Sequence, residues 1–335
     1  MPSESLTSRV THAIAICGVL LLVGCSAPAQ RASPLALSNV AIREEPWSFD
    51  NRPGRNIVTE HYVIHTTIDD RELLQSLATV MEGALVQYRQ FTPDVRLSAR
   101  PMECYVFAQR NEWAQFTREK TGADAAVYLQ INRGGYTVRD WYVAYLISEI
   151  GTYAVAAHEG WHQYVARHFK SRLPPFLEEG IATMFETIAW DANDRPRWNL
   201  GINPQRADKL RRAIEKHSLW PLQQLITMHA GDVVGLSGER IETFYAQDWA
   251  FAEFMWNAEN GRYRASMLRM LSDLANGTTP ESIGIRRSVI DTWNPETARP
   301  LLEYYFGMGL EEIDRAYLAY VKKIAAGTRQ SYGAV

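Results

Sequence analysis

The sequence contains little cysteine, no long apolar run and no excess of charge of one sign. With three cysteines in 335 residues, disulfides cannot supply the framework of the fold, so a buried apolar core has to stabilise it. The most apolar amino-terminal stretch, residues 13–23, is too short to cross a bilayer. The 35 basic and 38 acidic residues leave a net charge of −3, which gives no indication of a nucleic-acid partner. The remaining composition, 46% hydrophobic and 22% charged, is that of an ordinary globular protein.

The amino terminus has the pattern of an export signal. Arg9 precedes the apolar residues 13–23, which have the length of a signal-peptide core. The run ends in Leu22-Val23-Gly24-Cys25, which resembles the lipobox of bacterial lipoproteins, with an ordinary secretory signal as the alternative. The resemblance implies cleavage before Cys25 and lipidation of that cysteine, so that acyl chains anchor the protein to a membrane. Ser26, in place of an aspartate, then slightly favours the outer membrane of the bacterial envelope, with the protein facing the periplasm.

Beyond the signal peptide, residues 1–24, the chain divides into a tether and two lobes. Residues 25–47 are rich in proline, serine and alanine without apolar periodicity, which predicts a tether. Strands and helices alternate through residues 48–200, whereas residues 201–330 are mostly helical, so the predicted fold class is α+β. Cys104 lies in a predicted strand and is expected to be buried. The apolar periodicity predicts strands at 58–66, 103–107 and 126–131, and helices at 72–91, 113–119, 203–214, 221–226, 239–256, 263–274 and 310–324.

The most informative stretch is His158-Glu159-Gly160-Trp161-His162. On a helix, positions i and i+4 lie on one face, so the imidazoles of His158 and His162 can reach one metal ion. Glu159 lies further round the helix, where its carboxylate can address a water bound to that ion. The stretch therefore predicts a divalent-metal site with a general base beside it, and such a site needs a third ligand.

A third ligand is expected on a second helix. Pro174 and Pro175 interrupt the first helical pattern, because neither can continue its hydrogen-bond ladder. Residues 176–186 then have apolar side chains at helical spacing, and this segment carries Glu178 and Glu179 near its start. Spacing alone does not separate two adjacent carboxylates, so both are candidates.

Together the two stretches resemble the zinc peptidases of the gluzincin group, within the peptidase MA-like superfamily. There the third ligand is the glutamate of a hydrophobic-x-x-Glu-Gly-x-Ala stretch, which selects Glu179 here and leaves Glu178 as the fallback. The resemblance implies one Zn²⁺ ion held by His158, His162 and Glu179, with Glu159 as the general base. It also implies a zincin-like fold with a small mixed sheet, a metal-binding helix pair and a helical C-terminal lobe. A lipoprotein-associated bacterial domain family of unknown function is similar as well.

Four further residues are assigned by position relative to these motifs. Gly135 and Tyr136 correspond to the strand that binds substrate backbone in gluzincins, with a plain tight turn as the alternative. Tyr245 is the candidate donor to the oxyanion, against core packing as the competing role, and Tyr136 is an alternative donor. Glu186 is expected on the same helix face as Glu179, where it would orient a zinc histidine.

The predicted function is a membrane-anchored zinc metallopeptidase that hydrolyses a peptide or protein substrate in the bacterial cell envelope. The Gly-x-Met-Glu-Asn motif of aminopeptidase N-like members is absent near Gly135, which slightly favours an endopeptidase. The competing hypothesis is a lipoprotein that keeps the peptidase fold as a binding or scaffold module. The intact Glu159 argues against it, because a degenerate site usually loses the general base.

Overall fold

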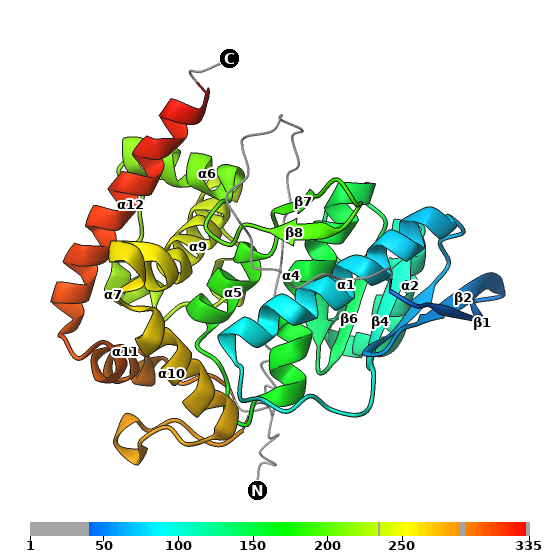
Figure 1. The fold of residues 1–335 in the computed structure, drawn as a ribbon, viewed down its shortest axis with the longest axis horizontal. Helices are drawn as coiled ribbons and strands as arrows, with labels where there is room; N and C mark the ends of the chain where they lie inside the picture. The colour runs from blue at the N-terminus through cyan, green and yellow to red at the C-terminus, as the bar shows by residue number, and fades with distance from the viewer. Residues whose placement is uncertain (1–39, 234, 289–291, 333–335) are drawn as a thin grey trace, which may run out of the picture.

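The computed structural model describes residues 40–233, 235–288 and 292–332. The predicted signal peptide, the lipidation site Cys25 and residues 25–39 of the predicted tether lie outside these ranges. The described chain is α+β, with a six-stranded mixed sheet on one side and a group of helices on the other (Figure 1). Within these ranges, each helix lacks the length or the apolar character needed to span a membrane.

The sheet lies in the half of the molecule on the right of Figure 1. In spatial order its strands are β1 (Arg43–Phe49), β2 (Arg52–Val58), β3 (Tyr62–Thr66), β4 (Met102–Phe107), β6 (Trp141–Tyr145) and β5 (Gly135–Val138). The central strands β3, β4 and β6 are parallel, and the remaining neighbours are antiparallel. β5 is therefore an edge strand, which confirms the strand predicted at Gly135 and Tyr136.

The strand β1 begins inside the predicted tether. It pairs with β2 through a hairpin whose connecting residues, Asp50 and Asn51, have φ of 50° and 61°. Both values are left-handed, as a type I′ turn requires, and Asn and Asp tolerate that conformation. Trp47 and Phe49 alternate with polar residues and contact the ring of Phe107. The prediction of a tether is therefore wrong from residue 43 onward, because this alternation is that of a half-buried strand.

Helices cover both faces of the sheet. α1 (Arg71–Phe91) and α4 (Glu149–His168) pack together on one face, while α2 (Arg110–Thr121) and α3 (Ala125–Tyr128) lie on the other. The helices predicted at 72–91 and 113–119 and the strand predicted at 103–107 are confirmed. Cys104 in β4 is fully buried, as predicted.

The predicted strand at residues 126–131 is wrong. The helix α3 occupies its first part, and turns occupy the rest. A short continuous apolar run without alternation does not distinguish a strand from a buried helical turn. Here the helical turn places Tyr128 against Tyr136 of β5, with ring centroids 4.3 Å apart.

The other half of the molecule is helical, apart from a short hairpin. Its elements are α5 (Pro175–Met184), β7 (Ile188–Trp190), β8 (Pro196–Trp198), α6 (Pro204–Glu215), α7 (Leu222–Leu225), α8 (Ala230–Val233), α9 (Gly238–Gly261), α10 (Arg264–Asn276), α11 (Ala298–Phe306) and α12 (Leu310–Tyr332). α5 packs against both α4 and α9, where the two halves meet (Figure 1). One apolar cluster extends from Ile57 in β2 to Val321 in α12, so the two predicted lobes share a core.

Candidate metal centre

α4 holds the first three residues of the centre in the interior. The hydroxyl of Ser148 accepts the backbone N–H of Gly151 at 3.1 Å and caps the start of the helix. The helix then passes between the sheet and α5, so its middle turns face protein on all sides. As a result His158, Glu159 and His162 are all buried.

Gly160 permits a close approach of α1 to the turn of α4 that carries His158 and His162. The hydroxyl of Tyr88 in α1 donates a hydrogen bond to the carbonyl oxygen of Ala157 at 2.5 Å. A Cβ atom at residue 160 would lie 2.6 Å from the same hydroxyl oxygen, which is closer than packing allows. Glycine therefore lets Tyr88 hold the helix at this turn.

α5 brings the third ligand against α4. Pro175 is the first residue of the helix, where its missing N–H leaves no hydrogen bond unmade. Glu179 follows one turn later and is buried. A Cβ at Gly180 would overlap the backbone carbonyl of Asp248 in α9, so this glycine allows α5 and α9 to pack closely. The Glu-Gly pair thus places a carboxylate beside α4 while the next residue packs on the helical half.

Three ligand atoms converge on one point. The Nε2 atoms of His158 and His162 are 3.3 Å apart. Oε2 of Glu179 lies 3.5 Å from Nε2 of His158 and 3.6 Å from Nε2 of His162, and it has no hydrogen-bond partner in the structure. These three residues form a buried group that could hold a metal ion. The structure therefore brings together the predicted ligands, with Glu179 rather than Glu178 facing the two Nε2 atoms.

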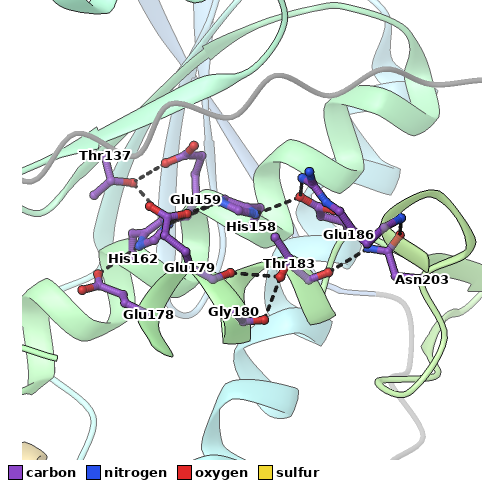
Figure 2. Close-up of polar contacts among 11 residues, drawn as sticks. Thr137, His158, Glu159, His162, Glu178, Glu179, Gly180, Thr183, Glu186 and Asn203 are labelled. Carbon is purple, nitrogen blue, oxygen red and sulfur yellow. Dashed lines mark hydrogen bonds and ion pairs between the residues drawn. The ribbon is translucent and has the colours of Figure 1, made fainter. Parts of the chain in front are cut away.

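The second ring nitrogen of each imidazole, Nδ1, lies beside a glutamate. The two glutamates are on opposite sides of the centre (Figure 2). Nδ1 of His162 lies 2.9 Å from Oε1 of Glu178, and Nδ1 of His158 lies 3.2 Å from Oε1 of Glu186. Glu178, the fallback ligand, therefore has a different place, because it contacts the nitrogen of His162 that faces away from Nε2 of His158. Carboxylates in such positions fix the imidazole tautomer so that Nε2 is free to bind a metal.

Glu186 makes the predicted contact with His158, a candidate metal ligand, but not from the predicted helix face. α5 ends at Met184, two residues earlier, so Glu186 lies in the segment that leads to the β7–β8 hairpin. Its Oε2 accepts a hydrogen bond of 3.1 Å from the side chain of Asn203. Burial acts to raise the pKa of Glu186, but Arg206 and His158 outweigh it and hold the pKa well below its usual range.

Glu159 is oriented by the edge strand. The hydroxyl of Thr137 in β5 lies 3.0 Å from Oε2 of Glu159 and 3.0 Å from its backbone carbonyl oxygen (Figure 2). The other carboxylate oxygen, Oε1, is buried and has no hydrogen-bond partner in the structure. Burial raises the pKa of Glu159, and Glu179 adds to that effect, while the two imidazoles oppose it. A carboxyl group with one free oxygen and a raised pKa suits proton transfer.

The charges of the centre favour a cation. Burial acts to raise the pKa of Glu179, but the two imidazoles outweigh it and lower the pKa to about 2. Burial acts to lower the pKa of His162, but Glu179 and Glu178 outweigh it and raise the pKa to about 10. At neutral pH the metal-free centre therefore holds a proton on His162 beside two glutamates. A bound metal ion would take the place of that positive charge.

The two tyrosines proposed as oxyanion donors have other surroundings. Tyr136 is fully buried on the α2 face of the sheet, where its hydroxyl donates to Thr117 at 3.0 Å. Because successive residues of β5 point to opposite faces, Tyr136 points away from α4 while Gly135 and Thr137 face it. The prediction of Tyr136 as a donor is therefore wrong. Tyr245 in α9 is buried beneath Arg206, whose guanidinium carbon is 5.4 Å from the ring centroid, so its role as a donor stays a prediction.

Two contributors to the centre were missed by the sequence analysis. Thr137 could have been found from the alternation of β5, which places it on the same face as Gly135. Arg206 belongs to α6, and no local pattern connects it to the metal motifs.

No family model and no curated protein matches the chain.

Proposed function

We propose that the protein is a zinc-dependent metallopeptidase with a zincin-like fold of the gluzincin type. The observation that carries the proposal is the triangle of ligand atoms, with sides of 3.3, 3.5 and 3.6 Å. Two ligand atoms bound to one tetrahedral Zn²⁺ ion at ordinary distances are separated by about 3.3 to 3.5 Å. Two imidazoles and one carboxylate are also a ligand set of catalytic zinc sites, which keep the fourth position open.

The residues around the triangle support hydrolysis. Bound between His158, His162 and Glu179, zinc would supply Lewis acidity, which polarises a carbonyl group and makes water acidic near neutral pH. Glu159 then takes a proton from the attacking water through Oε1 and passes it to the leaving nitrogen. Thr137 donates a hydrogen bond to Oε2 of Glu159, so Oε1 is the oxygen available for the proton transfer.

The edge strand supports a peptide as substrate. β5 pairs with β6 on one side, while its other edge carries no further strand of the described sheet. An extended peptide adds to such an edge through main-chain hydrogen bonds. Thr137 connects this strand directly to Glu159, so a peptide lying along β5 would pass close to the general base. Within β5, Gly135 and Thr137 lie on the face of the sheet that packs against α4.

The place of action is proposed from the amino terminus. A lipidated Cys25 would anchor the protein to a membrane of the bacterial envelope, with the outer membrane slightly favoured. Residues 26–42 would then separate the anchor from the first strand. Its substrate would be a peptide or protein of the envelope, and an endopeptidase is slightly favoured over an aminopeptidase.

The test combines metal analysis with peptide cleavage. Full-length protein is expected to bind one equivalent of zinc and to cleave members of a peptide library, whereas Glu159→Gln is expected to keep the zinc and lose cleavage. One equivalent of zinc without cleavage by the wild type in any condition would favour the scaffold function. Absence of zinc after reconstitution would contradict the proposed zinc metallopeptidase.

A further inference from the structure

Arg206 is an unusual residue in this fold, because it is the only buried lysine or arginine in the part of the chain that the structure describes. It lies in the first turn of α6, where Asn203 caps the helix by accepting the backbone N–H of Arg206 at 3.1 Å. Burying a guanidinium is unfavourable unless its charge and its hydrogen bonds are matched. The residues that Arg206 contacts therefore indicate its role.

The guanidinium of Arg206 donates two hydrogen bonds to the carboxylate of Glu186. Nε of Arg206 lies 3.0 Å from Oε2 of Glu186, and its Nη2 lies 2.6 Å from Oε1. This two-point geometry fixes both the position and the plane of a carboxylate, which a lysine could not do. The same Oε1 lies 3.2 Å from Nδ1 of His158, so a continuous series of polar contacts runs from α6 to a metal ligand.

The other imidazole has no such support. Glu178 contacts Nδ1 of His162 in the same way, but no lysine or arginine of the described residues pairs with it. Glu178 is also more exposed than Glu186, at 16% against 10% of the side chain. The ion pair therefore lies on the glutamate that contacts the more deeply buried of the two histidines, His158.

We infer that Arg206 is a positioning residue of the metal centre, which acts on the metal through Glu186 and His158. By holding the plane of the Glu186 carboxylate, it fixes the ring of His158 with Nε2 directed at the triangle. By matching the charge of Glu186, it keeps that carboxylate from acting as an unbalanced anion beside the imidazole. The inference rests on the proposed metal site but not on catalysis.

The experiment measures zinc affinity by competition with a chelator, together with the visible absorption spectrum of the Co²⁺-substituted protein. The variants are Arg206→Gln, Glu186→Gln, the double variant and Arg206→Lys. Arg211→Gln is the matched control, because Arg211 lies in the same helix and pairs with Asp208 and Glu215 near the surface. We expect Arg206→Gln to weaken zinc binding about tenfold and to alter the Co²⁺ spectrum. Arg211→Gln is expected to change neither.

The double variant decides whether Arg206 acts through Glu186. If it does, Arg206→Gln has no further effect on zinc affinity once Glu186 is already Gln, within about twofold. The double variant also carries no unbalanced buried charge, so we expect it to fold even if Arg206→Gln alone does not. Arg206→Lys keeps the positive charge but cannot form the paired hydrogen bonds to the Glu186 carboxylate, so it is expected to weaken zinc binding several-fold.

Two results would overturn the inference while leaving the proposed function intact. One is a zinc affinity and a Co²⁺ spectrum of the Arg206 variants equal to those of the wild type. The other is an effect of Arg206→Gln that persists in full in the Glu186→Gln background. A wild-type protein that binds no zinc would instead refute the proposed function itself.

Discussion

The two histidines of the centre occupy equivalent positions one turn apart on α4, yet they are supported in different ways. Both direct Nε2 to the same point and Nδ1 to a glutamate. His162 depends on Glu178, which comes from the adjacent helix α5. His158 depends on Glu186, which is held by Asn203 and Arg206 of the helical half. Both glutamates therefore come from the helical half, but only the one beside His158 is held in turn by residues at the start of α6.

The helical half contributes unequally to the two imidazoles. The spacing on α4 places the two imidazoles on one helix face, whereas α6 supplies the buried cation that balances Glu186. Changes in α6 are therefore expected to reach the metal through His158, whereas changes near the start of α5 reach it through His162.

The largest effect is expected where the two sides are equal, at the ligands. His158→Ala and His162→Ala each remove one of three protein ligands, so each is expected to lower zinc affinity at least about a thousandfold. Metal content after dialysis, measured by mass spectrometry, checks this. His168→Ala is the control, because His168 lies at the end of α4 and contacts the backbone of Tyr164 and Ser98. A full equivalent of zinc in either ligand variant would remove that residue from the centre.

The next effect separates binding from catalysis. Glu159→Gln keeps the shape of the side chain and removes the proton acceptor, so kcat/KM is expected to fall about 10²- to 10⁴-fold. Zinc content should stay at one equivalent, because Glu159 is not in the ligand triangle. Steady-state kinetics on a cleaved peptide, with exposed Glu60→Gln as the control, measures the effect. Retained activity would exclude Glu159 as the general base.

A smaller effect is expected to distinguish the two sides directly. Glu186→Gln should weaken zinc binding about 30- to 100-fold, because it disturbs His158 and leaves Arg206 without its carboxylate. Glu178→Gln should weaken it only about tenfold or less, because Glu178 is nearer the solvent and balances no arginine. Chelator competition measures both. Equal losses, or a larger loss for Glu178→Gln, would show that the two sides do not differ as described.

The smallest effect concerns the stability of the metal-free protein as a function of pH. The pKa of His162 is raised to about 10 in the metal-free fold, so its contribution to stability is complete below about 6.5 and is lost as the pH rises toward 10. Zinc removes this dependence, because it replaces the proton on His162. The drop in melting temperature caused by a chelator is therefore expected to be larger at pH 9 than at pH 6.5. A drop that does not grow with pH would argue against protonation of His162 in the metal-free form.

Much of the centre could be predicted from the sequence, because its core is local. The i, i+4 spacing of His158 and His162 determines that both imidazoles lie on one helix face, whatever surrounds the helix. The prolines predicted a break before the second helix, and that helix carries the third ligand. The choice of Glu179 over Glu178 required the resemblance to gluzincins, since adjacent carboxylates look alike in sequence.

The remaining features depend on contacts between distant segments. Arg206 reaches Glu186 only because the β7–β8 hairpin returns the chain to the end of α5, and no periodicity encodes that path. The run at residues 126–131 was assigned to a strand because short apolar runs fit both structures. The start of β1 could not be predicted because the residues before Trp47 are mostly polar, so the apolar alternation covers only the end of the strand.

Zinc K-edge X-ray absorption on the wild-type protein, reconstituted with one equivalent of zinc, tests directly whether the three residues hold the metal. We predict four-coordinate zinc with two imidazole nitrogens, one carboxylate oxygen and one further light atom, at distances of about 2.0 to 2.2 Å. Loss of one imidazole contribution in His158→Ala would assign the signal to this site. Zinc that fails to bind, or that binds with a ligand set unaffected by His158→Ala, would contradict the central claim.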